Sequence, residues 1–277
     1  YIKNLGIKKL IKLIQKYKTL ENIYKLSKDK LMETSGISEK IANNMIDKKV
    51  RNNVDNALKY MKQNNINVIS VFDDDYPQML KEIYAPPICL YIKGNLQLLK
   101  MQNISLIGCR KCSQYGKKTA YYFSYNLSKA GFNIVSGLAR GIDSYSHIGC
   151  LAAKGKTIAV MGSGLDNIYP KENEQLVNEI IKQNGAIITQ YPLGTKPEKN
   201  NFPARNRIIS GLSKAVLVIE ARAKSGTLIT VDFALEQGKD VFAVPGNINS
   251  ANSVGTNELI KQGAIPVCNY KDILDNI

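Results

Sequence analysis

The stretch from Ile134 to Asp143, Ile-Val-Ser-Gly-Leu-Ala-Arg-Gly-Ile-Asp, has the residue types of a phosphate-binding turn. An apolar run leads into Gly137 and Gly141, where the backbone can turn tightly and approach a ligand. An Asp placed to cap the next helix, and the unpaired N–H groups at its start, suit the binding of an anion. Arg140 adds a positive charge inside the turn. The alternative is a tight strand-to-helix turn that serves packing alone.

Three further glycine turns suggest phosphate chemistry, but none completes an enzyme motif. Gly162-x-Gly164 begins a dinucleotide fingerprint, yet Asn167 stands where the third glycine belongs. Gly155-Lys156-Thr157 resembles the end of a P-loop but leads into a strand, so no helix N-terminus would face a nucleotide. Ser225-Gly226-Thr227 precedes a helix and forms a second candidate anion site. Neither paired carboxylates nor a nucleophile–base pair accompanies these turns, so we expect binding without catalysis and no cofactor.

The segment from Lys199 to Arg207 combines an aromatic ring with three cations. Phe202 stands between Lys199 on one side and Arg205 and Arg207 on the other. Cations that follow a phosphate backbone and a ring that stacks on a base are what a single-strand binder needs. The alternative is a surface loop in which Phe202 is anchored in the core.

The cysteines do not suggest a disulfide framework or a metal site. There are five, an odd number, which is typical of a reducing, cytoplasmic protein. Cys109 and Cys112 form a C-x-x-C pair, but a zinc ion would need two more ligands. The remaining candidates are Cys89, Cys150, Cys268 and the single His147. We therefore expect no metal or redox use of the Cys109–Cys112 pair, and a packing or surface role for His147.

The net charge points to a polyanionic partner. The chain has 277 residues, with 38 Lys and Arg against 23 Asp and Glu, a formal charge of +15 and a pI near 9.4. A genome that favours Lys, Asn and Ile would raise this charge without a functional cause. No apolar run approaches the length of a membrane span and no signal peptide opens the chain, so we expect no membrane association. Because the first residue is Tyr1 and not Met, we expect a trimmed chain.

The chain divides into a helical part, a connector and a strand-rich part. Residues 1–65 are expected to form short helices around apolar positions such as Leu10 and Ile14, including a helix pair around the turn at Ser35–Ser38. Such a pair is common in small DNA-contacting modules and equally in plain helical bundles, where its lysines are only a solvated face. Residues 66–102 are expected to be a connector with short strands.

From residue 103 onward, strands and helices alternate, which predicts an α/β domain with a largely parallel sheet and helices on both faces. Ligands of such sheets bind at the carboxyl ends of the strands. The turns at Gly108, at 136–143, at 162–164 and at 220–227 all fall at such ends. The expected strands are Ile104–Ile107, Asn133–Val135, Thr157–Val160, Ala186–Thr189, Ala215–Ile219, Val241–Val244 and Ile265–Val267.

Together these motifs carry a family resemblance. Gly108-Cys109-Arg110, the run 136–143, Gly162-Ser163-Gly164-Leu165-Asp166, the run 201–211 and Ser225–Thr230 resemble, in order, the DNA-processing DprA (Smf) family. The resemblance spans about residues 74–267. It implies an extended Rossmann-like domain that binds single-stranded DNA, protects it and helps load the RecA recombinase during natural transformation. It also implies a cytoplasmic homodimer without catalytic activity, and a small N-terminal helical domain like a sterile-alpha-motif fold.

The resemblance also assigns roles to individual residues. Arg110 matches an arginine that contacts DNA phosphate, Lys199 a DNA-contacting lysine, and Phe202 a ring near a base. Arg140, Arg205 and Arg207 lie in family motifs on the same face. Cys109 replaces the usual small hydroxyl residue, and many members continue past the position of Ile277 into a winged-helix-like domain.

Two alternatives to a DNA-binding protein remain open. One is a nucleoside-phosphate hydrolase of a related Rossmann-like group, in which a Glu follows the phosphate loop; here Thr230 stands at that place. The other is a scaffold that only supports a recombinase. The predicted phosphate turns comprise Gly108, Gly137, Gly141, Gly162, Gly164, Ser225, Gly226 and Thr227.

Overall fold

The computed structural model describes residue 2 and residues 5–277 and divides into two compact units. One unit comprises the chain through Asn67 together with Ala85–Ile88. The other comprises Val68–Tyr84 and Cys89–Ile277. Among the described residues, no helix combines the length and apolar character needed to cross a bilayer.

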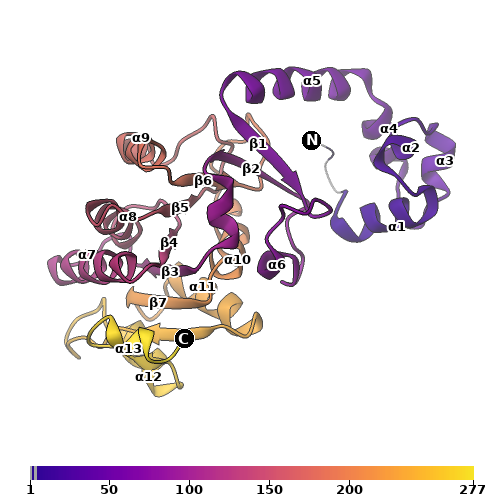
Figure 1. Ribbon diagram of the computed structural model, residues 1–277. Helices are drawn as coiled ribbons and strands as arrows, with labels where there is room; N and C mark the ends of the chain where they lie inside the picture. The colour runs from indigo at the N-terminus through magenta and orange to yellow at the C-terminus, as the bar shows by residue number, and fades with distance from the viewer. Residues whose placement is uncertain (1, 3–4) are drawn as a thin grey trace. The chain divides into compact units, whose positions relative to one another are not determined.

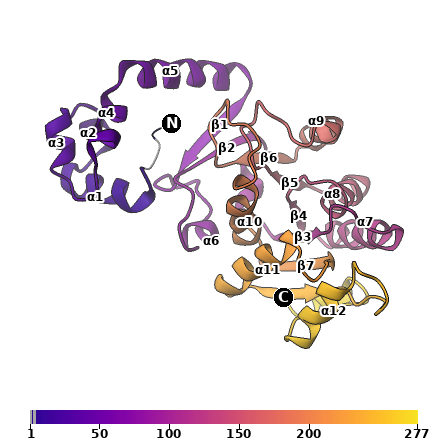
Figure 2. The same cartoon turned by 180° about the vertical axis from the view of Figure 1, so that it is seen from behind.

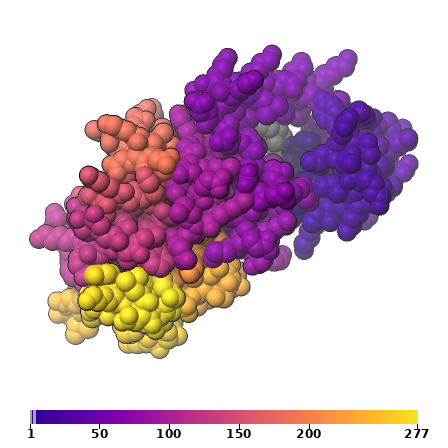
Figure 3. Space-filling model, viewed as in Figure 1, coloured from indigo at the N-terminus to yellow at the C-terminus, as the bar shows by residue number. Residues whose placement is uncertain are grey.

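The N-terminal unit is helical, in agreement with the small helical part expected from the sequence. Thr19 and Ser27 accept hydrogen bonds at the starts of two of its helices, and Asp47 caps another. Its core gathers apolar side chains from successive helices, including Leu13 and Ile41. The space-filling view shows this unit from indigo to purple (Figure 3). The helices are α1 (Ile7–Tyr17), α2 (Leu20–Tyr24), α3 (Lys28–Met32), α4 (Glu39–Ile46) and α5 (Lys48–Gln63).

A nine-stranded, largely parallel sheet dominates the rest of the chain, which confirms the predicted fold class. The strand order is β1-β2-β6-β5-β4-β3-β7-β8-β9. Strands from β6 to β9 in this order pair in parallel, and β2 pairs antiparallel with β6. The strands are β1 (Ile66–Ser70), β2 (Cys89–Gly94), β3 (Asn103–Gly108), β4 (Asn133–Ser136), β5 (Thr157–Val160), β6 (Ala186–Thr189), β7 (Ala215–Glu220), β8 (Asp240–Ala243) and β9 (Ile265–Pro266).

The segment expected to be a connector contributes two strands to this sheet. Strands β1 and β2 extend the sheet beyond β6, with Tyr91 opposite Thr189. The short helix α6 (Gln78–Lys81) and the 3₁₀ turn η1 (Leu96–Lys100) lie on either side of β2 in the chain.

Helices cover both faces of the sheet (Figure 1 and Figure 2). Helices α7 (Gln114–Lys129), α8 (Ile142–Ala152) and α9 (Glu174–Lys182) lie side by side on one face. Helices α10 (Asn201–Gly211) and α11 (Gly226–Glu236) pack together on the other. The central strands are apolar along their whole length because both of their faces are buried. The remaining elements are η2 (Lys171–Asn173), α12 (Val254–Lys261) and α13 (Lys271–Leu274).

Candidate nucleic-acid interface

The strand order places a cavity at the switch point of the sheet. The chain builds β3, β4, β5 and β6 in one direction and then returns to add β7 on the other side of β3. Turns that leave β3 and β7 therefore diverge to opposite faces and leave a crevice at the carboxyl ends of these strands. A cavity of about 680 Å³ lies there. We call it the switch-point pocket; its polar and aromatic lining comprises Cys109, Arg110, Lys111, Asp143, Tyr169, Lys199, Phe202, Arg205, Asn206, Arg222, Lys224, Ser225, Thr227 and Thr230.

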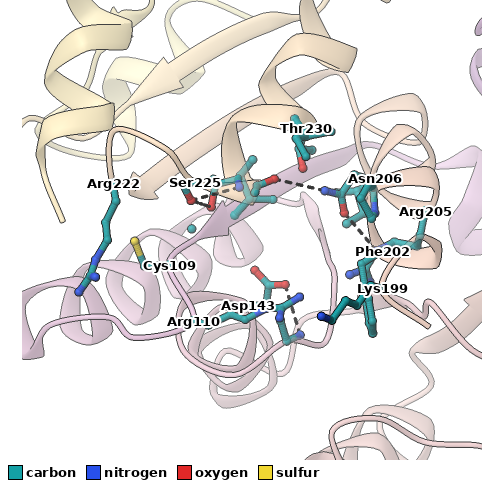
Figure 4. A pocket seen from close by; sticks show the side chains of 18 of the residues that line it. Cys109, Arg110, Asp143, Lys199, Phe202, Arg205, Asn206, Arg222, Ser225 and Thr230 are labelled. Carbon is teal, nitrogen blue, oxygen red and sulfur yellow. Dashed lines mark hydrogen bonds between the residues drawn. The ribbon is translucent and has the colours of Figure 1, made fainter. Parts of the chain in front are cut away.

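The lining is strongly positive. It includes six Lys and Arg side chains and a single carboxylate, Asp143. The cations come from three places: the turn after β3, the start of α10 with the loop before it, and the turn after β7. Figure 4 shows Arg110, Lys199 and Phe202 around the same opening, with Ser225 and Thr230 on the opposite wall. The pocket thus suits a ligand that carries several negative charges.

Phe202 lies between the cations and the glycine turn after β5. The ring is half-buried, and the guanidinium carbons of Arg110 and Arg205 lie 5.4 and 6.0 Å from its centroid. Its edge rests on Gly162, where a side chain would collide with the ring. The ring of Tyr169 lies 5.7 Å away, tilted by 50°. Phe202 is therefore packed on the protein and also contributes to the pocket surface, so both sequence interpretations describe part of its environment.

Arg205 forms the floor of the pocket. Only 3% of this residue is exposed, and its guanidinium donates to the carbonyl oxygens of Gly137 (2.5 Å) and Val160. Burial lowers the pKa of Arg205 to about 10, and the nearby Asp143 carboxylate opposes this shift, so the side chain stays charged at neutral pH. The sequence predicts that Arg205 contacts DNA; in the structure its Nη1 donates to these two carbonyls and its Nε to Asn206 Oδ1, while the residue still lines the pocket.

Asp143 occupies the turn that the sequence marks as a phosphate site. It lies in the first turn of α8, and its Oδ2 accepts from the Ala139 N–H at 3.3 Å. Burial raises the pKa of its carboxyl group, and Arg205 acts in the opposite direction. A side chain at Gly137 would collide with both Asp143 and Arg205. The protein's own Asp143 side chain therefore occupies the turn at which the sequence predicts a phosphate.

Several other predicted residues lie outside the switch-point pocket. Arg140 is exposed and pairs through two nitrogens with the Glu172 carboxylate. Arg207 donates to the carbonyl of Ala204 and to Gln190 Oε1 (2.6 Å), away from the pocket lining. The predicted glycines at which a side chain would meet close neighbours are Gly108, Gly137, Gly141, Gly162 and Gly164, of which Gly108 also lines the pocket.

The predicted anion site before α11 does line the pocket. Ser225 caps the helix: its Oγ accepts from the Thr227 N–H at 3.2 Å and lies 2.9 Å from Thr227 Oγ1. Gly226 is exposed with open space around it. Asn206 approaches from α10 and donates to the Gly226 carbonyl at 3.5 Å. Hydroxyl and amide groups thus face the cations across the pocket.

Sequence reasoning missed three cations and the residue that connects them. Lys111 follows β3, and Arg222 and Lys224 follow β7. Asn252, from the turn after β8, joins the two turns: its Nδ2 donates to the Lys111 carbonyl (3.0 Å) and its Oδ1 accepts from Arg222 Nε (3.0 Å). The rule that strand ends carry ligands could have found the cations, whereas nothing local marks Asn252.

Buried Glu220 completes this connection. Its carboxylate accepts from the Ser113 N–H at 2.9 Å and from the Ser113 hydroxyl, at the start of α7. The Asn252 amide also lies within 3.4 Å of Glu220 Oε2. Because the carboxylate is committed to the α7 N-terminus and to Asn252, it is not positioned as a catalytic base in the pocket.

Cys109, Cys150 and His147 are buried, whereas Cys89 and Cys112 are partly buried and Cys268 is exposed. Among the described residues, no group of three or more His, Cys, Asp and Glu side chains could hold a metal. Burial raises the pKa of both Cys109 and Cys112, which makes their thiols less reactive. His147 is buried, with its Nδ1 2.7 Å from Thr157 Oγ1.

Comparison with known proteins gives consistent matches. The family model for DNA recombination-mediator protein A matches residues 67–277. Protein Smf of Synechocystis is 40% identical over all of this chain and 70% of its own length. DNA processing protein DprA of Streptococcus pneumoniae is 46% identical over 74% of this chain and 72% of its own length.

Two solved structures are also similar. The X-ray structure of DNA processing protein A from Streptococcus pneumoniae aligns with a TM-score of 0.84 at 36% identity, covering 99% of this chain and 94% of that one. The structure of the Helicobacter pylori protein, reported for its single-stranded DNA binding mode, aligns with a TM-score of 0.67 at 32% identity. It covers 76% of this chain and 94% of that one.

Proposed function

Because the chain belongs to the DNA recombination-mediator protein A family, we propose that it binds single-stranded DNA in the switch-point pocket. The observation that carries this proposal is the convergence of six cations and two aromatic rings, those of Tyr169 and Phe202, on a single cavity. Cations neutralise phosphates and a ring stacks on any base, so together they favour a strand whose bases are unpaired. The Helicobacter pylori relative is described as binding single-stranded DNA, which supports the proposed ligand.

Within this proposal the exposed cations contact phosphate and Phe202 contacts a base. Arg110 and Lys199 are both exposed at the pocket. The planar guanidinium of Arg110 can hold a phosphate through two hydrogen bonds, which an ammonium cannot do. Arg205 acts from below by fixing the turn at Gly137, and Arg140 and Arg207 have no direct part.

The wider role follows from the family resemblance. We propose that the protein protects incoming single strands during natural transformation, helps to load the RecA recombinase, and acts as a cytoplasmic homodimer. It has no catalytic turnover in this proposal. Asp143 is buried opposite Arg205, and Glu220 is turned toward Ser113, so neither carboxylate is placed to activate water in the pocket. Incubation with ATP and with nucleoside monophosphates should release no product above a buffer blank.

Fluorescence anisotropy with a single-stranded oligonucleotide, titrated with salt, tests the binding site. For the wild type, log affinity should fall with log salt at about −0.7 per phosphate contact. Arg110→Ala and Lys199→Ala should each weaken binding about tenfold or more, since a hydrogen bond to a charged group contributes about 1.5–3 kcal/mol. Arg110→Lys should lose less than Arg110→Ala. Alanine variants that fold normally and retain wild-type affinity would overturn the assignment.

A further inference from the structure

Helix α7 carries a concentration of tyrosine that its helical structure does not require. Four of the 15 tyrosines of the chain lie within its 16 residues, which also contain three lysines but no Asp or Glu. Exposed helix positions favour residues such as Ala, Lys and Glu, and tyrosine is a poorer helix former. The repeated tyrosines are therefore not explained by helix stability.

Five of these side chains lie on one side of α7. With about 100° of rotation per residue, they fall within an arc of roughly 120°. Ala120 and Leu127 lie outside this arc and are buried in the core beneath the helix. The side chains within the arc are exposed or partly exposed. We call this side of the helix the α7 surface; it comprises Lys117, Lys118, Tyr121, Tyr125 and Lys129.

Rings and ammonium groups follow one another along the α7 surface. The rings of Tyr121 and Tyr125 are stacked, with centroids 6.1 Å apart and planes 15° from parallel. The Lys129 ammonium lies 5.8 Å from the Tyr125 centroid, and the Lys117 ammonium lies 5.5 Å from the centroid of Tyr145 on α8. Among the described residues, Tyr121 has no ring or cation contact besides Tyr125, and 39% of it is exposed. Its ring is therefore accessible to a further planar group.

The lysines of this surface are not paired with carboxylates. In the part of the chain that the structure describes, no ion pair involves a lysine of α7. Helix α8, which packs beside α7, contains a single acid, Asp143, and this side chain is buried near Arg205. The α7 surface therefore presents positive charge together with aromatic rings.

The α7 surface begins close to the switch-point pocket. Lys111 lines the pocket, and α7 starts at Gln114, three residues later. A nucleic-acid strand that leaves the pocket at Lys111 is thus at the first turn of α7. From Lys117 to Lys129 the surface extends about 18 Å along the helix axis, which is the rise of about five nucleotides at roughly 3.4 Å each.

These features favour a single strand over a duplex or a lipid surface. A duplex keeps its bases paired, so it would use the lysines and leave the rings without a role. A helix that lies on a membrane inserts its own apolar face, but the apolar face of α7 is buried in the core. Rings interleaved with cations are the arrangement that binds unpaired nucleotides without sequence preference.

We propose that the α7 surface continues the path of single-stranded DNA beyond the switch-point pocket. A base stacks on Tyr121, and the ammonium groups of Lys117 and Lys129 neutralise phosphates on either side of the ring pair. This inference rests on the proposed function of the pocket and adds a second segment to it. Because only a strand longer than the pocket reaches α7, the contribution of this surface depends on the length of the oligonucleotide.

The first test compares the full chain with its variants by fluorescence anisotropy on oligothymidylates of about 6 and about 25 nucleotides. Tyr121→Ala with Tyr125→Ala places good helix formers in α7. This variant should bind the long oligonucleotide about tenfold more weakly at every salt concentration, because stacking does not depend on salt. Its affinity for the short one should be unchanged. The control Tyr60→Ala removes a tyrosine of similar exposure (43%) from α5 and should bind both as the wild type does.

The second test concerns the lysines. Lys117→Gln with Lys129→Gln should lower the salt slope for the long oligonucleotide by about 0.7 for each phosphate that is no longer neutralised. The slope for the short oligonucleotide should not change. The matched control, Lys62→Gln with Lys182→Gln, removes the same charge from exposed positions on α5 and α9 and should keep the wild-type slope.

Each outcome decides the proposal. An equal gain of affinity with length in the wild type, the α7 variants and the controls would overturn it, as would an equal loss of duplex affinity in the tyrosine variant. Arg110→Ala should weaken binding at both lengths. If the pocket assignment is wrong, Arg110→Ala will retain affinity for the short oligonucleotide, so the two failures give different patterns. If the double tyrosine variant melts early, Tyr121→Ala alone, at an exposed position, provides the same comparison on a folded protein.

Discussion

The switch-point pocket and the α7 surface combine positive charge with aromatic rings in two different ways. The pocket combines arginines and lysines with two aromatic rings, and rests on a buried Arg205 and Asp143 that face each other. The α7 surface has lysines and stacked tyrosines on one side of a helix and no arginine. The first arrangement is shaped for a ligand with a particular geometry, whereas the second is an open surface along which a strand can lie.

The two regions differ in the residues that support their charged side chains. In the pocket, hydrogen bonds from Arg205 to the backbone of β5 and of the turn after β4 hold the surface in place. Beneath the α7 surface lies the apolar core, to which α7 contributes Phe123 and Leu127. Substitutions beneath the pocket should therefore alter stability, and substitutions on the α7 surface should alter mainly binding.

The largest effect is expected for Arg205→Leu. Removal of the guanidinium takes away the cation that counteracts the effect of burial on the pKa of Asp143. It also leaves the carbonyl groups of Gly137 and Val160 without this donor. We expect a loss of about 3–5 kcal/mol in the free energy of unfolding, measured by urea denaturation. Asp143→Asn in the same background should recover part of this loss. Lys199→Leu, at an exposed position, is the control and should leave the urea midpoint unchanged. Normal stability with weakened DNA binding would return Arg205 to the role predicted from sequence.

Phe202→Ala should have a smaller effect, divided between binding and stability. Base–aromatic stacking contributes about 1–3 kcal/mol per base and does not depend on salt, so single-strand affinity should fall about tenfold with an unchanged salt slope. Because the ring also packs on Gly162 and Tyr169, the melting temperature should fall as well. Phe202→Tyr should keep most of the affinity. A large fall in melting temperature with near-normal binding by the folded fraction would show that the ring is only structural.

The parallel sheet could be predicted because the sequence of each of these strands shows its own apolar pattern. Apolar runs such as Thr157–Val160 and Ala186–Thr189 are bounded by turns, and the structure reproduces those limits. The place of β1 and β2 could not be predicted, since an apolar run does not identify its partner strand. Their pairing beyond β6 depends on contacts between distant segments.

The residues that line the pocket surface were predictable in part, whereas those beneath it were not. Arg110, Lys199 and the Ser225 turn are at the strand ends where the rule places ligands. The sequence around Arg205 contains evidence that this residue is buried. Arg205 has the spacing i, i+3, i+4 with the buried Ile208 and Ile209, which is typical of the inner face of a helix, here α10. A charge on an apolar stripe needs a partner from another element, and the sequence does not say which one.

Buried His147 should make the stability of the pocket-bearing unit depend on pH. The Thr157 hydroxyl donates to the Ile134 carbonyl (2.7 Å), so His147 must donate from Nδ1, which leaves Nε2 without a partner. Burial lowers the pKa of His147 to about 3, against about 6.5 when unfolded.

Between pH 6.5 and 3, His147 binds a proton in the unfolded protein but not in the folded one. Its contribution to the stability of the folded protein is therefore fully present above pH 6.5 and is lost as the pH falls toward 3. The stability of the wild type relative to His147→Gln should therefore decrease by up to about 1.4 kcal/mol per pH unit in this window. Urea midpoints of both proteins at several pH values measure this difference. Parallel pH profiles would show that His147 does not titrate as a buried group. The gain of affinity with oligonucleotide length through the α7 surface should not follow this dependence while the protein remains folded.

The smallest effect is expected for Asn252→Ala, which tests whether polar contacts between the turns hold the pocket cations in place. The variant removes the acceptor of Arg222 and the donor to the Lys111 carbonyl, and Asn252 is not itself a lining residue of the pocket. Single-strand affinity should fall a few-fold, and the salt slope should fall by no more than about 0.7, the value of one phosphate contact.

A double-mutant cycle separates an effect of Asn252 on the position of Arg222 from an effect on stability. If Asn252 acts through Arg222, then Asn252→Ala should add little in an Arg222→Ala background, because residues that act as a unit are not additive. Full additivity, with a lower melting temperature in both backgrounds, would mean that Asn252 only stabilises the turn after β8. In that case the two cationic turns would act independently of each other, and the contrast between the pocket and the α7 surface would reduce to the arginines of the pocket and its buried floor.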